Sequence, residues 1–468
     1  MIKTFTIDFT EFSQETLVRS NYKTTILGIE IKKHIQKAEN KFVRLKDFFD
    51  IVSGFAFKSA DYEQEGLPLI RIGDVGNDFD ENNMVFLPED YREDYKRFLL
   101  KKNDIVVSLT GDGKLKSDLI LEDNKYLLNQ RVGSLRAKEN TNVLFFYYLI
   151  NYYSLTKKQF YWWSNGKTQL NISPFDFLKI KIPLISKPKQ DQLVAQIEPI
   201  ENKIKELKEQ IEPQQKVINK VFAREFGFDL EKFEKLKKIK NYYLDLFAFG
   251  NNRDIRQSVK FHREAGIFII EQLKKVTNKK IKHFIAEPIV LGTSVSPSNY
   301  DDNGDYFYVS MANIKNWKFE SEDSKLVSKE YSDQSQNKTV SKDDILIARS
   351  GEGTIGKVAL VDDEDLLGIF ADFTMRIRLK NYNPLFAYYY FRTEYFQYLI
   401  EVNKKGLGNN TNIFPSQIQE LPMIDVSLKA QQKIVDEIKA GLDKQEEIKS
   451  KIESERNKID EIIEKAIK

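Results

Sequence analysis

An internal duplication constrains the fold of this chain more than any other feature. The run 102–113, KNDIVVSLTGDG, returns 240 residues later as 342–353, KDDILIARSGEG. The paired residues are identical or conservative except at one place, where Leu109 faces Arg349. A duplicated fold makes a pseudo-symmetric molecule, and such a molecule suits a partner with two sites, of which duplex DNA is the obvious case.

The repeat covers most of the chain, because further matches keep the same order and nearly the same offset. They pair 51–54 with 289–292, 69–75 with 308–314, 171–174 with 412–415, and 182–184 with 421–423. A chain of 468 residues is also too long for one hydrophobic core. The sequence therefore predicts two equivalent domains.

Each copy begins with a mixed part, which makes the fold class α+β. Short β-branched runs at 104–108 and 344–348 are bounded by Gly and Asp and predict strands. Aromatic stretches at 143–153 and 384–400 predict helices. The mixed parts form two β-rich domains, at 1–188 and 228–428.

A long charged helix is expected to follow each mixed part, at 189–227 and 429–468. Apolar residues recur at three- and four-residue steps in both segments. Pro199 and Pro213 predict kinks or breaks in the first helix, and Gly441 weakens the second. Each stripe could pack on its own domain. A helix of about 50 Å is too long for that, so we expect an antiparallel coiled coil between the two.

Composition excludes several classes of site. The chain has no Cys, so disulfides and thiolate chemistry are excluded, which fits a cytoplasmic protein. Its three His residues are scattered, and we expect no metal site. No apolar run or leader predicts a membrane segment. Lys and Arg total 73 against 70 acidic residues, which leaves room for a local basic face.

Two motifs resemble cofactor sites without their context. The run 351–356 matches G-x-G-x-x-G, but a strand rather than a helix is predicted next, and the other copy has Lys116 in place of the third Gly. The run 383–386, NPLF, lacks the second Pro of an amino-methyltransferase motif and reads as a helix start. We expect a turn between strands and a helix cap.

The chain resembles the specificity subunit of type I restriction–modification systems in both halves. The resemblance rests on three strings that each occur twice in the same order. They are the strand and turn at 344–356 and 104–113, the N-I-x-P step at 171–183 and 412–422, and the Gln-rich helix starts at 189–194 and 430–435.

This resemblance implies that each mixed part is a target recognition domain for one half of a split DNA sequence. The paired helices would set the distance between the half-sites and dock two methyltransferase (modification) subunits. The chain itself would hold no catalytic residue and no cofactor. S-adenosylmethionine, ATP and Mg²⁺ would belong to partner subunits, which include helicase–nuclease restriction subunits.

The residues that read DNA are nominated here by chemistry alone, since Arg and Lys suit guanine and phosphate, and Asn and Gln suit adenine. A polar loop precedes N-I-x-P in both copies, and cations flank the Gly turns. The candidates are Lys114, Lys116, Asn165, Lys167, Gln169, Arg349, Lys357, Lys404, Lys405, Asn409 and Asn410.

Several alternatives stay open. The polar loops could be ordinary turns, and Trp162 and Trp163 could pack in the core. Arg71, Arg131, Arg349 and Arg376 could form structural ion pairs. The chain could also serve a related system with differently organised methyltransferase and nuclease partners. A tandem enzyme would need the same reactive groups in both copies, and the shared polar pairs are Asp104/Asp344, Asp8/Asp245, Asn171/Asn412 and Tyr62/Tyr300.

Overall fold

The computed structural model divides the chain into two compact units. Unit 1 comprises residues 1–210 and 448–468, and unit 2 comprises residues 211–447. The structure describes residues 22–38, 41–76, 79, 84–111, 114–166, 169–239, 241, 243, 247, 259–320, 324–351, 353–406 and 411–467. Helix α15 (Leu428–Ile467) contributes its first residues to unit 2 and its last to unit 1.

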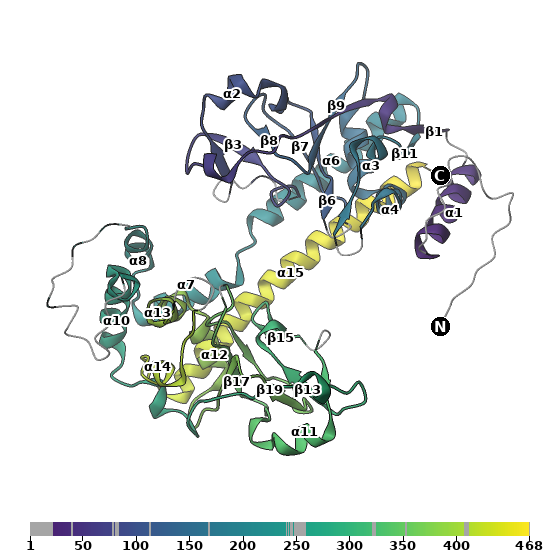
Figure 1. Cartoon of the computed structure of the whole chain (residues 1–468). Helices are drawn as coiled ribbons and strands as arrows, with labels where there is room; N and C mark the ends of the chain where they lie inside the picture. Colours follow the sequence, from purple (N-terminus) through teal and green to yellow (C-terminus); the bar gives the residue numbers. More distant parts are fainter. Residues whose placement is uncertain are drawn as a thin grey trace. The chain divides into compact units, whose positions relative to one another are not determined.

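Each unit contains a four-stranded antiparallel sheet with the same strand order. In unit 1 the order is β2 (Phe49–Ser53), β9 (Val132–Ala137), β5 (Ile105–Ser108) and β7 (Ser117–Leu119). In unit 2 it is β12 (Val290–Leu291), β20 (Thr374–Ile377), β17 (Ile345–Ala348) and β18 (Val358–Leu360). This match of strand order confirms the duplication. Figure 1 labels β7 and β9 of unit 1 and β17 of unit 2.

A three-stranded sheet accompanies each of these, again with matching order and direction. The strands are β4 (Val85–Leu87), β3 (Leu67–Ile70) and β8 (Leu127–Leu128) in unit 1, and β16 (Leu326–Val327), β13 (Tyr306–Val309) and β19 (Gly368–Phe370) in unit 2. In both sheets the middle strand is antiparallel to the first neighbour and parallel to the second.

The central strands β5 and β17 are buried along their whole length, which explains their continuous β-branched sequences. A glycine lies at the end of the first strand of each sheet for a steric reason. A Cβ at Gly54 would lie 2.0 Å from the carbonyl oxygen of Asn129, and one at Gly292 would lie 2.1 Å from that of Ala371. Only glycine permits these backbone approaches.

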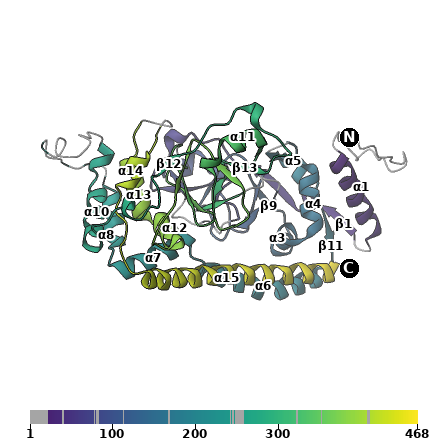
Figure 2. The ribbon, with the colours of Figure 1, turned by 90° about the horizontal axis from the view of Figure 1, so that it is seen from below.

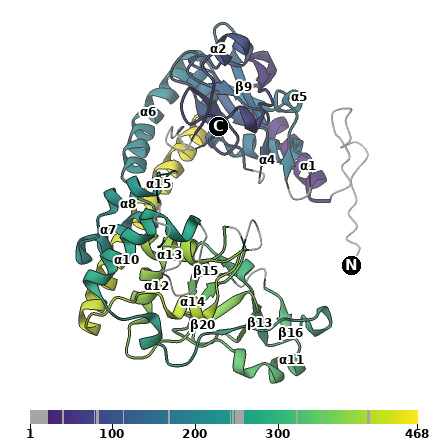
Figure 3. The ribbon, with the colours of Figure 1, turned by 60° about the vertical axis from the view of Figure 1, so that its left-hand side comes forward.

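Helices cover the sheets at equivalent places. In unit 1 these are α1 (Tyr22–Lys37), α3 (Val143–Tyr152) and α4 (Ser154–Trp163), and α1 contacts α4 (Figure 3). In unit 2 they are α10 (Glu264–Val276), α12 (Pro384–Arg392) and α13 (Glu394–Asn403). The single helix expected at 384–400 is interrupted at Thr393, whose hydroxyl caps α13 at the backbone N–H of Phe396.

The remaining short elements connect these layers. Unit 1 also has β1 (Lys41–Arg44), α2 (Tyr91–Asp94), β6 (Thr110–Gly111), β10 (Leu170–Asn171), α5 (Pro174–Phe177) and β11 (Lys181–Leu184). Unit 2 also has α8 (Leu230–Lys237), β14 (Ile314–Lys315), β15 (Lys318–Phe319), α11 (Lys329–Gln334) and α14 (Pro415–Gln419).

The first long stripe forms two helices, α6 (Lys187–Glu209) and α7 (Gln214–Phe226). The break confirms the effect expected of Pro213, which stands at the N-cap of α7, whereas Pro199 lies inside α6 without ending it. Gln445 of α15 compensates the break, because its side-chain oxygen accepts a hydrogen bond of 2.7 Å from the backbone N–H of Glu212.

Helix α15 runs antiparallel to both. In unit 2, Glu212 of the break contacts Gln445, and further along Arg224 of α7 forms an ion pair with Glu437. In unit 1, Lys203 of α6 forms an ion pair with Glu455 of α15. Figure 2 shows α6 beside α15. The expected antiparallel helix pair is therefore present. None of the helices in the described part of the chain has the length and hydropathy that a bilayer crossing requires.

Candidate nucleic-acid interface

In unit 1 the Gly turn and the loop before N-I-x-P lie side by side. Strand β6 pairs with β10, and the backbone N–H of Ile172 donates to the carbonyl of Leu109 at 2.9 Å. The hydroxyl of Thr110 donates to the side-chain oxygen of Asn171 at 2.7 Å. We call residues 109–111, 165–166 and 169–172 junction 1.

Junction 2, residues 349–351, 405–406 and 411–413, is the same arrangement in unit 2. Ser350 pairs with Asn412, and the backbone N–H of Ile413 donates to the carbonyl of Arg349 at 2.9 Å. In both junctions the loop closes on the shared Asn: Asn165 pairs with Asn171, and Lys405 with Asn412. Two candidate regions that are far apart in the sequence are thus brought together twice.

The loop candidates differ in their surroundings. Asn165, Gln169 and Lys405 are exposed, so their side chains can reach a ligand. Gly166 shapes the first loop at φ 123°, because a Cβ there would lie 2.1 Å from the carbonyl oxygen of Gln169. Lys167, Asn409 and Asn410 lie outside the described residues.

The Gly-turn lysines are equivalent between the units, with a correction to the sequence alignment. The carbonyl of Lys116 accepts from the backbone N–H of Ser108 at 3.0 Å, and that of Lys357 accepts from Ala348 at 2.9 Å. Lys116 therefore matches Lys357 rather than Gly356, because the turn in unit 2 is one residue longer. Lys114 and Lys116 are exposed, and Lys357 is partly exposed.

Lys357 and Lys404 both line a cavity of 390 Å³ beside the Gly turn of unit 2. Its wall also contains Arg392 and two carboxylates, Glu394 and Glu401. The Lys404 ammonium lies 2.6 Å from Glu401, so its charge is locally compensated. Although burial opposes the effect, hydrogen bonds from Lys260 and Lys404 lower the pKa of Glu401. Lys357 is thus better suited than Lys404 to bind an external anion.

Arg349 of junction 2 lies between two aromatic rings that the sequence did not connect with it. Its guanidinium carbon is 5.8 Å from the ring centroid of Phe373 and 5.5 Å from that of Phe414. One terminal N–H donates to the Asn412 side-chain oxygen at 3.4 Å. In the sequence, Arg349 stood out only because it aligns with Leu109 in the other copy of the repeat.

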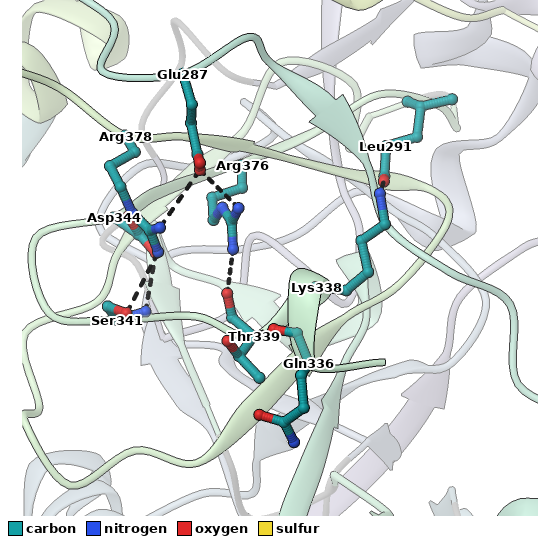
Figure 4. Close-up of polar contacts among 9 residues, drawn as sticks. All are labelled: Glu287, Leu291, Gln336, Lys338, Thr339, Ser341, Asp344, Arg376 and Arg378. Atoms are coloured by element: carbon teal, nitrogen blue, oxygen red, sulfur yellow. Dashed lines mark hydrogen bonds and ion pairs between the residues drawn. The ribbon is translucent and has the colours of Figure 1, made fainter. Parts of the chain in front are cut away.

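The shared Asp104 and Asp344 have a structural role. Asp344 is buried and receives two hydrogen bonds of 2.7 Å from Arg378 (Figure 4). Glu287 extends the network through Arg376 and Arg378, at 2.6 and 3.4 Å. Asp104 likewise accepts from Ser134 at 2.9 Å and pairs with Arg136 at 3.3 Å. Arg376 is therefore a structural arginine, and the paired Asp residues are not free for catalysis.

Other sequence motifs also have structural explanations. The run 351–356 is a turn between β17 and β18, as expected, with Gly351, Gly353 and Gly356 at positive φ. Asn383 caps α12 at the backbone N–H groups of Leu385 and Phe386. Trp162 is buried against Gly28 of α1 and so belongs to the core.

The other arginines and the last shared polar pair named from the sequence have different surroundings. Arg71 pairs with Asp74 at 3.6 Å, whereas Arg131 is exposed. Asp8 and Asp245, one of the shared polar pairs, lie outside the described residues. Within those that the structure describes, no three His, Asp or Glu side chains gather as metal ligands would.

Residues 37–214 and 267–457 match the family described as "Type I restriction modification DNA specificity domain". The type I restriction enzyme MjaVIII specificity subunit of Methanocaldococcus jannaschii is 33% identical over 38% of this chain and 43% of its own length. The EcoAI specificity subunit of Escherichia coli is 25% identical over 34% of this chain and 28% of its own length. The alignments thus span less than half of these curated relatives.

Two solved structures are also similar. One is the crystal structure of the type I restriction–modification system S subunit from M. genitalium, with 14% identity, 92% and 96% coverage of the two chains, and a TM-score of 0.41. The other comes from a study of complex assembly and conformational transition of the type I restriction–modification system, with 13% identity, 92% and 97% coverage, and a TM-score of 0.44.

Proposed function

Because this chain belongs to the type I restriction modification DNA specificity domain family, we propose that it is the DNA-specificity subunit of a type I restriction–modification complex. Each unit binds one half of a bipartite target. The observation that carries the proposal is the recurrence of the turn–loop junction: junctions 1 and 2 share backbone pairing but differ in their side chains. Two domains that share a fold but recognise different bases need the same backbone arrangement with different side chains.

The side chains of the junctions divide into two roles. Exposed Asn165 and Gln169 can pair with base edges, since amide groups match adenine. Lys116 and Lys357 stand where a cation can neutralise a phosphate, which positions the duplex without reading it. Lys114 in unit 1 and Lys405 in unit 2 are two further exposed candidates for phosphate contacts. Lys167, Asn409 and Asn410 remain candidates on sequence grounds.

The catalytic steps are assigned to partners. Two modification subunits would bind S-adenosylmethionine and methylate adenine, and restriction subunits would use ATP and Mg²⁺ for translocation and cleavage. The antiparallel helices α6, α7 and α15 are the proposed docking elements. This chain would act in the cytoplasm and bind no cofactor of its own. Domain boundaries at 188, 227 and 428 follow from the same proposal.

Methylome sequencing tests this function in cells. A host that carries this chain with its modification subunit should methylate adenine within one bipartite motif, and deletion of this chain should abolish that methylation while the modification subunit is still produced. Purified chain alone should neither methylate nor cut DNA. Methylation that persists without this chain, or activity of the chain alone, would contradict the proposal. A related system with fused partners would give the motif with a different partner composition.

A further inference from the structure

Arg349 departs from the repeat in both chemistry and surroundings. It is the one chemical mismatch in the duplicated strand and turn, where unit 1 has the buried Leu109. Its backbone N–H donates to the carbonyl of Phe373 at 3.0 Å, and its carbonyl accepts from Ile413, the residue before Phe414. The segments just before β20 and α14, which these bonds hold against Arg349, therefore carry the two rings that bracket it.

The two rings restrict the guanidinium without neutralising its charge. Phe373 and Phe414 are 45% and 39% exposed, so the two rings flank the guanidinium at the protein surface. Both rings lie within cation–π distance of the guanidinium carbon. Such a bracket lowers the rotamer freedom that the arginine would lose on binding a planar partner.

The donors of Arg349 lack the partners that structural arginines have here. Its Nε is buried without a hydrogen-bond partner, as is that of Arg376, but no carboxylate among the described residues forms an ion pair with the Arg349 guanidinium, which donates to the neutral Asn412 at 3.4 Å. Arg378, one strand away, is by contrast held by Asp344. The charge of Arg349 is therefore not compensated by a carboxylate within the described residues, which fits an acceptor supplied by a ligand.

We propose that Arg349 reads a guanine in the half-site bound by unit 2, with Phe373 and Phe414 holding its guanidinium in the reading orientation. Guanine presents two acceptors, O6 and N7, which match the arginine fork. A phosphate contact would need only a positive charge, for which Lys357 is the proposed candidate in unit 2. This inference rests on the proposed function. It goes further by naming guanine as one base of the half-site and Arg349 as the residue that selects it.

The test is selection from a randomised duplex library by the complex of this chain with its modification subunit. Arg349→Leu reproduces the residue found at the equivalent place in unit 1 and should therefore fold. We expect it to lower the preference for guanine at one position of one half-site by roughly 5- to 150-fold, with the other half-site unchanged. Arg349→Lys should bind DNA but discriminate less, because it cannot form the bidentate pair.

Lys342→Leu is the matched control, because it removes one exposed cation just before the same strand. It should leave every base preference unchanged. The inference fails if Arg349→Leu keeps all preferences while its melting temperature falls, which would make the residue structural. It also fails if affinity falls evenly for all sequences, which would indicate a phosphate contact. Should Arg349→Leu not fold, Arg349→Lys decides by the same criteria. The wild-type bipartite motif tests the proposed function separately.

Discussion

A Cβ added at Gly441 of α15 would lie 2.8 Å from Cγ1 of Val217 in α7. The glycine that weakens the helix in isolation therefore lies where α15 and α7 approach each other closely in unit 2. Val217 is buried and β-branched, so it has little freedom to move away. Close packing at this point offsets the lower helix propensity of glycine.

Gly441→Ala should consequently destabilise the protein, although alanine favours an isolated helix by about 1 kcal/mol. We expect a net loss of about 1–2 kcal/mol from overpacking against Val217. Thermal and urea unfolding of the full chain measure it. Gly441→Ala combined with Val217→Ala relieves the clash and should be less destabilising than the sum of the two single changes. Strict additivity would show that these residues do not interact.

Asp344→Asn should cost about 3 kcal/mol of stability, because it leaves Arg378 without its buried bidentate partner. Asp104→Asn should act in the same direction in unit 1. Lys342→Ala removes one member of the exposed pair with Glu364 and should leave stability nearly unchanged, because solvent screens that pair. Denaturant unfolding compares the three. A stable Asp344→Asn protein that lost a chemical activity would instead favour the tandem-enzyme alternative.

Lys116→Ala and Lys357→Ala should each weaken DNA binding evenly across sequences and reduce the salt slope of log K by about 1. Lys235→Ala is the control, since Lys235 is exposed on α8 and paired with Glu231 at 2.6 Å. Binding titrations of the complex at several salt concentrations provide the slopes. A changed base preference with an unchanged slope would assign these lysines to base readout instead.

Local sequence was sufficient to predict the architecture where the same signal occurred twice. The strand and turn at 104–111 and 344–351, the N-I-x-P step and the Pro213 break all depend on residues close together in the chain. The buried Gln190 and Gln431 show why the Gln-rich helix starts recur: each donates to a backbone carbonyl five residues earlier, at 2.9 and 2.8 Å.

Contacts between distant segments could not be predicted in this way. Phe373 reaches Arg349 only because β20 pairs with β17, and Gly441 meets Val217 only because the helices run antiparallel. The sequence alignment paired Lys116 with Gly356, whereas in the structure Lys116 is equivalent to Lys357. The turn before Lys357 is one residue longer than the turn before Lys116, and such an insertion leaves the pairing of the next strand unchanged. The nominated DNA contacts at 409 and 410 stay predictions.

The most direct test of the account is the consensus selected by the complex of this chain and its modification subunit from a randomised duplex library. We predict two short specified half-sites separated by a fixed number of unspecified base pairs, with exchanges at junction 1 altering one half-site and exchanges at junction 2 the other. A single contiguous motif, or one half-site that responds to both junctions, would contradict the assignment of one reader to each unit.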